Sequence, residues 1–146
     1  MRRSKTEIYL HFVWATAKRQ PFLRPEVERA VHRCIRLEVE KMKCVVLACD
    51  GMPDHVHLVV QLHPTATPAR LAQAVKGTSS TLARNRFAFE EPFDWQDNYA
   101  AFSISRSQLN RVISYVKNQK RHHATGETCD EWEQTDEEAE LAEPKK

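Results

Sequence analysis

The sequence has no apolar run that approaches the ~20 residues needed to span a membrane, which argues against an integral membrane protein. Its N-terminus leads directly into a strand-like segment and not into the apolar stretch of a signal peptide. The four cysteines form no Cys-x-x-Cys pair, which argues against a disulfide framework and against a zinc knot. Internal repeats and low-complexity linkers are also missing. We therefore expect a soluble, cytoplasmic protein, and the length of 146 residues favours one domain.

Positive charge is concentrated in the first 126 residues. The formal net charge is only +2, but residues 127–146 hold nine acidic residues and two lysines, so they carry −7 and residues 1–126 carry +9. A basic body predicts a polyanionic partner, nucleic acid first. We expect a functional domain over 1–126 and an acidic, flexible tail over 127–146. The tail either competes with nucleic acid for the basic face or only keeps the protein in solution.

Hydrophobic periodicity predicts seven elements in the order strand, helix, strand, strand, helix, strand, helix. We expect strands at 7–15, 44–49, 55–62 and 99–105, a turn at 50–54, and helices at 25–42, 69–85 and 107–123. The first six elements follow the split β-α-β, ferredoxin-like pattern. The sequence therefore predicts an α+β fold in which helices cover one face of the sheet and a further C-terminal helix follows. In that pattern the third strand is central and lies beside the first.

Two histidines stand at the start of the third predicted strand. Side chains two apart on a strand point to the same face, so His55 and His57 should lie side by side, with Val56 and Leu58 facing the other way. Neutral imidazole is the commonest side-chain metal ligand, so two on one rigid strand form half of a metal site. On this spacing alone, a pair of histidines at the edge of the core is the more frequent outcome.

The last predicted helix carries a tyrosine and a glutamine one turn apart. Apolar residues from Leu109 to Val116 form its core stripe, and Tyr115 and Gln119 lie on the same flank of that stripe. Residues four apart are neighbours on a helix, so a hydroxyl and a carboxamide should emerge together at the edge of the core. Either residue alone is usually a packing residue. Together with the histidine pair and the basic body, they indicate a functional site.

These motifs resemble those of the single-tyrosine HUH transposases, where HUH means His-hydrophobic-His. That family includes small insertion-sequence transposases and their REP-associated relatives. The resemblance covers residues 6–123 and leaves out the acidic tail. It rests on several ordered motifs: Met52-Pro53-Asp54-His55-Val56-His57-Leu58, Lys76-Gly77-Thr78-Ser79-Ser80, Trp95-Gln96 with Tyr99, Tyr115-Val116-Lys117-Asn118-Gln119, and the opening Tyr9-Leu10-His11-Phe12-Val13-Trp14.

The resemblance implies that His55, His57 and Gln119 bind a divalent metal ion and that Tyr115, on the C-terminal helix, is the nucleophile. It also implies single-stranded DNA with hairpin ends as substrate, and a homodimer. We expect Mg²⁺ or Mn²⁺, because magnesium prefers oxygen ligands whereas imidazole suits manganese better. Two alternatives stay open at this point. One is a host-adopted nuclease of the same fold, and the other is a nucleic-acid-binding module without catalysis.

Basic residues in three segments are candidates for phosphate contacts, although each could equally be a solvated surface charge. Trp95 and Tyr99 could stack on bases, but they more plausibly anchor a loop to the core. His11 is interpreted as a structural histidine or one that supports a site residue. The candidate DNA-binding residues are Lys18, Arg19, Lys76, Arg84, Arg86, Lys117, Lys120 and Arg121, with His122 and His123 following at the end of the last helix.

Overall fold

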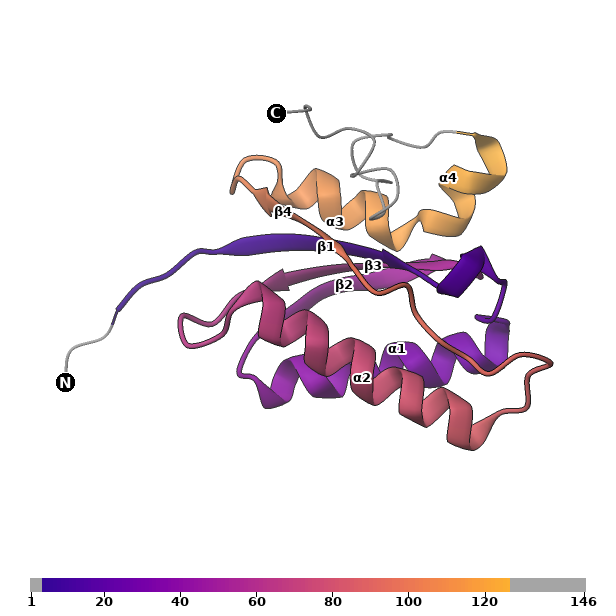
Figure 1. Ribbon diagram of the computed structural model, residues 1–146. Coiled ribbons are helices and arrows are strands. Elements are labelled where there is room, and N and C mark those ends of the chain that lie inside the picture. The colour runs from indigo at the N-terminus through magenta and orange to yellow at the C-terminus, as the bar shows by residue number, and fades with distance from the viewer. Residues whose placement is uncertain (1–3, 127–146) are drawn as a thin grey trace, which may run out of the picture.

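The fold is built on one antiparallel sheet, seen in a computed structural model that describes residues 4–126 (Figure 1). Its four strands are β1 (Tyr9–Ala15), β2 (Val45–Met52), β3 (His55–Gln61) and β4 (Ala100–Ile104), in the order β2-β3-β1-β4. Strand β3 therefore lies between β2 and β1, as the ferredoxin-like pattern predicts. Within the described residues, no helix is long and apolar enough to cross a membrane.

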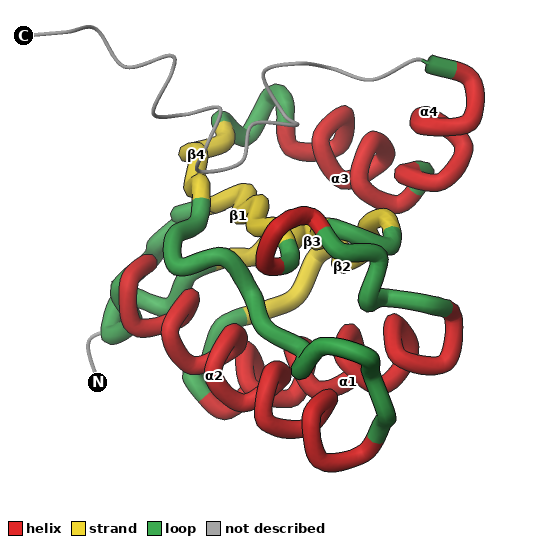
Figure 2. The backbone as a smooth tube through the Cα atoms, turned by 45° about the vertical axis from the view of Figure 1, so that its right-hand side comes forward, coloured by secondary structure: helices red, strands yellow, loops and turns green. Residues whose placement is uncertain are grey.

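The two faces of the sheet are covered by different helices, as Figure 2 shows. Helices α1 (Pro25–Lys41) and α2 (Pro68–Arg86) cover one face, and α3 (Leu109–Lys117) and α4 (Gln119–Thr125) lie on the other. A short 3-10 helix, η1 (Ala17–Arg19), follows β1. The predicted α+β architecture, with two sheet-covering helices and a separate C-terminal helical segment, is confirmed.

Strand β3 supplies side chains to both faces by simple alternation. Val56, Leu58 and Val60 are fully buried in the large apolar core beneath α1 and α2. Val59 faces the opposite way, into a smaller core formed with α3. His55 and His57 share the face of Val59, because residues two apart on a strand point in the same direction. The fold therefore places both imidazoles under the C-terminal helices.

The β2–β3 hairpin is tighter than the sequence predicts. The turn was expected over 50–54, but β2 continues to Met52 and only Pro53 and Asp54 lie outside the strands. Gly51 explains the difference, since it pairs with Val56. A Cβ atom on Gly51 would lie 2.2 Å from the carbonyl oxygen of His55, so only glycine permits this approach of the two strands.

The C-terminal helical segment is also divided where one continuous helix was predicted. Asn118 interrupts it with φ −108° and ψ 25° and separates α3 from α4. The Asn118 side chain donates from Nδ2 to the carbonyl oxygen of Ser114 at 2.7 Å, in competition with the regular helical pattern. The break changes the direction of the chain after α3, so α4 does not continue along the axis of α3 (Figure 1).

We predict that Gly51→Ala destabilises the protein by about 2 kcal/mol or more, because its Cβ meets backbone that cannot move without opening the hairpin. Urea unfolding at neutral pH measures this change. Gly77→Ala is the matched control: it lies within α2 and its Cβ would meet nothing within 4 Å, so it should stabilise by up to ~1 kcal/mol. Equal effects of the two substitutions would contradict the close approach at Gly51.

Candidate functional site

Two buried histidines of β3 form the centre of the candidate site. His55 is 5% exposed and His57 is fully buried, in a sheet face that also carries the apolar side chains of Ala48 and Val59. Their ring centroids lie 5.1 Å apart and their planes meet at 73°. Buried polar rings are costly unless their nitrogens have partners, so the contacts of each ring decide what it can do.

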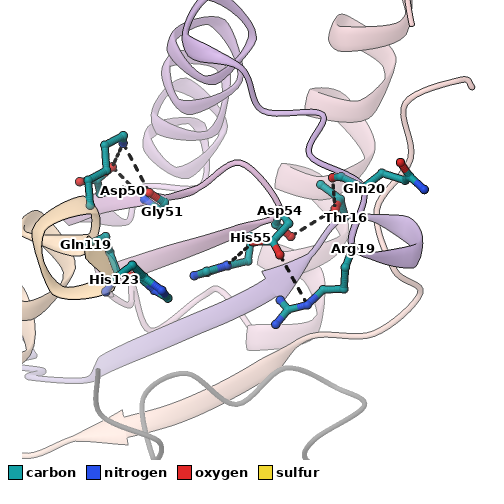
Figure 3. Close-up of polar contacts among 10 residues, drawn as sticks. Thr16, Arg19, Gln20, Asp50, Gly51, Asp54, His55, Gln119 and His123 are labelled. Atoms are coloured by element: carbon teal, nitrogen blue, oxygen red, sulfur yellow. Dashed lines mark hydrogen bonds and ion pairs between the residues drawn. The ribbon is translucent and has the colours of Figure 1, made fainter. Parts of the chain in front are cut away.

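Asp54 holds the ring of His55. Its Oδ1 lies 2.7 Å from Nδ1 of His55, and Nε of Arg19 lies 3.8 Å from its other oxygen (Figure 3). The hydrogen bond from His55 is the largest effect that lowers the pKa of the Asp54 carboxyl, and the nearby charges of His55 and Arg19 act in the same direction. With Nδ1 donating to this carboxylate, Nε2 is the nitrogen by which His55 would bind a metal ion.

His11 holds the ring of His57 in a similar way. Its Nε2 lies 2.8 Å from Nδ1 of His57, and the two rings stack with centroids 5.1 Å apart. His11 is 1% exposed and stands on β1, the neighbour of β3 in the sheet. This contact fits its interpretation as a histidine that supports a site residue. When His57 donates from Nδ1 to His11, its Nε2 presents a lone pair for a metal ion.

Helices α3 and α4 bring the tyrosine and the glutamine over the histidine pair. Tyr115 is 6% exposed, and its ring centroid lies 6.2 Å from that of His57. Gln119 is fully buried, deeper than the core-edge position predicted for it, and its Nε2 donates to the carbonyl oxygen of Tyr115 at 3.3 Å. The structure therefore gathers His55, His57, Tyr115 and Gln119 between β3 and the C-terminal helices.

Two contributors to this site had no assigned role in the sequence. Asp54 belongs to the predicted turn and to the quoted family motif without a role of its own, although a carboxylate directly before a candidate ligand is a signal for an orienting partner. His123 was noted as the end of the last helix, yet it lies four residues after Gln119 and its ring centroid is 5.1 Å from that of His55. The i, i+4 spacing could have identified it.

A second polar cluster joins α4 to the sheet and to α1. Glu28, His32 and Asp50 offer ligand atoms that lie within 4.8 Å of one another and could by distance hold a metal ion. The ammonium of Lys120 lies between the two carboxylates, 2.8 Å from Oε1 of Glu28 and 3.0 Å from Oδ1 of Asp50. Lys120 thus supplies the positive charge that this cluster needs and ties the start of α4 to the body of the protein.

The basic residues of α2 lie on the sheet face opposite the histidines. Nζ of Lys76 donates to the carbonyl oxygens of Gln96 and Asn98 at 2.5 and 2.8 Å, which fixes the loop before β4. Arg84 donates to the carbonyl oxygen of Phe93, and Arg86 is exposed near the end of α2. The structure does not bring these three residues to the candidate site.

Trp95 is an anchor of that same loop. It is 4% exposed, and its indole Nε1 donates to Oγ of Ser79 at 3.0 Å. Its ring packs edge-on against Trp14 at a centroid distance of 5.8 Å. Tyr99 is partly buried against Phe12. Both aromatic residues therefore hold a loop to the core. This is the role that the sequence analysis favoured over stacking on bases.

Other predicted basic residues stand on elements that also carry or contact site residues. Lys18 and Arg19 belong to η1, where both have positive φ, and Arg19 contacts Asp54. Lys117 and Arg121 are exposed on the helices that carry Tyr115 and Gln119. Positive charge is thus carried by η1 and by the C-terminal helices.

Comparison with known proteins identifies the family to which this combination of fold and motifs belongs. Residues 4–119 match the family described as "Transposase IS200 like", so the chain belongs to the IS200-like transposase family. The family-level resemblance of the motifs is thereby confirmed. The ISDra2 transposase TnpA of Deinococcus radiodurans is similar to this chain, with 24% identity over an alignment of 130 residues that covers 82% of this chain and 91% of that protein.

Two solved structures share the fold. A transposase from Deinococcus radiodurans R1 matches with a TM-score of 0.66 and 24% identity, over 82% of this chain and 98% of that one. A REP-associated tyrosine transposase, whose structure was determined bound to a REP hairpin, matches with a TM-score of 0.65 and 13% identity, over 84% of this chain and 73% of that one.

We predict that His32 makes folding sensitive to mild acid. Burial lowers the pKa of His32 from 6.5 to about 4; the carboxylate of Asp50 opposes this shift, and the charges of Lys120 and Arg36 act with it. The unfolded chain therefore binds a proton between pH 6.5 and 4 that the folded chain does not, and stability falls as the pH decreases through this window, by roughly 2–3 kcal/mol. In urea unfolding at pH 7 and pH 4.5, His32→Gln should lose less stability than the wild type. An identical loss in both proteins would contradict this assignment.

We also predict that Lys120→Met loosens α4. The substitution leaves Glu28 and Asp50 without their shared cation, so the free energy of unfolding should decrease by about 1 kcal/mol. The value is modest because Lys120 is 57% exposed. Hydrogen exchange of the α4 amides should accelerate about fivefold. The control is Lys117→Met, an exposed lysine one turn earlier, which should leave exchange unchanged. Equal exchange in both variants would show that Lys120 does not fasten α4.

Proposed function

We propose that this protein is a DNA transposase that cleaves and rejoins single-stranded DNA, with Tyr115 as nucleophile and with His55, His57 and Gln119 as ligands of a divalent metal ion. The observation that carries the proposal is the packing of Tyr115 against His57, with the two ring centroids 6.2 Å apart. Family membership makes transposition the context for that arrangement. We propose residues 1–126 as the functional domain, whereas the acidic tail lies outside the described residues.

The chemistry of the donor set fits a divalent ion. Asp54 and His11 engage Nδ1 of the two ligand rings, which is the usual way in which a protein orients metal-binding histidines. Two imidazoles and an amide oxygen carry no net charge, so the ion would keep its full positive charge. A bound ion would polarise the scissile phosphate and offset the charge that develops on it. Mg²⁺ or Mn²⁺ suits this role, and the imidazole ligands favour Mn²⁺ in vitro.

The proposed reaction exchanges one phosphodiester for another. Oη of Tyr115 forms a bond to phosphorus and gives up its proton, and the bond from phosphorus to the 3′ oxygen breaks as that oxygen takes up a proton. The products are a 5′-phosphotyrosine and a free 3′-hydroxyl. The new ester is close in energy to the old one, so a second 3′-hydroxyl can displace Tyr115 and join the strands without a nucleotide cofactor. Because a phenol has a pKa of about 10, Tyr115 depends on its surroundings for activation.

The partner that we propose is single-stranded DNA with a hairpin end. Support comes from the basic residues of η1 and of the C-terminal helices, Lys18, Arg19, Lys117 and Arg121, and from the homologue solved with a REP hairpin. Lys120 is tied to Glu28 and Asp50, so we propose that its main contribution is to hold α4. By the same family resemblance we propose that the protein acts as a homodimer.

The test is incubation of the full chain with single-stranded DNA that carries the candidate element ends, with Mn²⁺, Mg²⁺ or a chelator, followed by denaturing electrophoresis. We expect a metal-dependent covalent adduct that Tyr115→Phe abolishes. The matched control is Tyr99→Phe, which removes a partly buried hydroxyl from the far face of the sheet and should keep the adduct. An adduct that persists in Tyr115→Phe would overturn the nucleophile. No adduct despite measured metal and DNA binding would favour a non-catalytic binding module.

A further inference from the structure

His123 lies inside the candidate metal centre. Its ring centroid is 5.1 Å from that of His55, at an interplanar angle of 55°, and its Nε2 lies 3.2 Å from Oε1 of Gln119. Figure 3 shows the His55 and His123 side chains directed toward one another, one from the sheet and the other from α4. The sequence-based ligand set of His55, His57 and Gln119 leaves this fourth polar side chain without a function.

We infer that His123 is a further protein ligand of the divalent metal ion, an inference that rests on the proposed function of this site. Metal–nitrogen bonds of about 2.1 Å place two ligand atoms on one ion about 3.0–3.4 Å apart. The 3.2 Å between Nε2 of His123 and Oε1 of Gln119 lies within that range. Two imidazoles on one ion have centroids about 4.6 Å apart at the right angle of octahedral coordination and about 5.3 Å apart at a tetrahedral angle, so a shared ion allows values between these. The centroid distances from His55 to His57 and from His55 to His123 are both 5.1 Å.

Local structure supports this ligand set. Gln119 and His123 are four residues apart on α4, so they project from the same side of the helix. Ligands at i and i+4 on one helix commonly share a single ion, as in the His-x-x-x-His pattern of zinc proteases. The other two ligands stand at i and i+2 on β3, which is the equivalent spacing for a strand. One strand and one helix turn would thus enclose the ion from both sides.

The contact between His123 and Gln119 also allows a simpler role. Nε2 of His123 could donate a hydrogen bond to the amide oxygen and only orient it. The two roles differ in a measurable way, because a ligand contributes a directly bound nitrogen and an orienting residue does not. A third imidazole would further shift the preference of the site from magnesium toward manganese and other transition ions.

The experiment uses the full chain loaded with Mn²⁺ and counts the bound imidazole nitrogens by electron spin echo envelope modulation, with affinity from an electron paramagnetic resonance titration. We expect three nitrogens in the wild type and two in His123→Ala, with Mn²⁺ affinity reduced at least about tenfold. His57→Ala is the positive control and should also lose one nitrogen. His63→Ala, on the loop before α2, is the matched control and should keep three.

The outcomes separate the inference from the proposed function. A decrease in the number of bound imidazole nitrogens from three in the wild type to two in both His57→Ala and His123→Ala supports the inference. Two nitrogens in the wild type, or a count that is unchanged in His123→Ala while His57→Ala loses one, would overturn the role of His123 and leave the proposed metal site standing. No Mn²⁺ binding by the wild type, or a count unchanged by His57→Ala, would overturn the proposed site itself. Thermal unfolding of each variant establishes that it is folded.

Discussion

Strand β3 is central in the sheet and buried on both faces, and this constraint governs the rest of the structure. One set of its side chains, Val56, Leu58 and Val60, must match the core beneath α1 and α2. The alternate set places His55 and His57 under α3 and α4. A shift of register by one residue would bury the histidines in the apolar core and expose the valines to the site. The same alternation therefore stabilises the fold and positions the candidate ligands.

Burial of several polar rings on one sheet face imposes a second requirement, which neighbouring elements meet. Asp54 holds one ligand ring and His11 the other. Lys120 fastens α4 through Glu28 and Asp50, so the helix that carries Gln119 is held on the same chain's histidine face. These contacts restrict the rotation of each ring and the position of the helix before any ion or DNA is present, which is the preorganisation that a catalytic site needs.

The sequence predicted elements with strong local patterns and missed features that arise between elements. Helices α1 and α2 lie within one residue of the predicted ends, because their apolar periodicity and N-terminal prolines are local signals. The break at Asn118 was missed, since the apolar stripe ends just before it and the side-chain hydrogen bond from Asn118 to Ser114 is visible only in the structure. His55, His57, Tyr115 and Gln119 were selected by motif. The contacts of His11 and Lys120 join segments far apart in the chain, and no spacing rule reveals them.

The most direct test of the central claim is crystallographic: growth of crystals with Mn²⁺ and data collection at the manganese absorption edge. We expect an anomalous difference peak enclosed by His55, His57 and Gln119, between β3 and the C-terminal helices. The cluster of Glu28, His32 and Asp50 offers a competing location, but the ammonium of Lys120 occupies it. A peak at that cluster with none on the histidine face would contradict the proposed metal site.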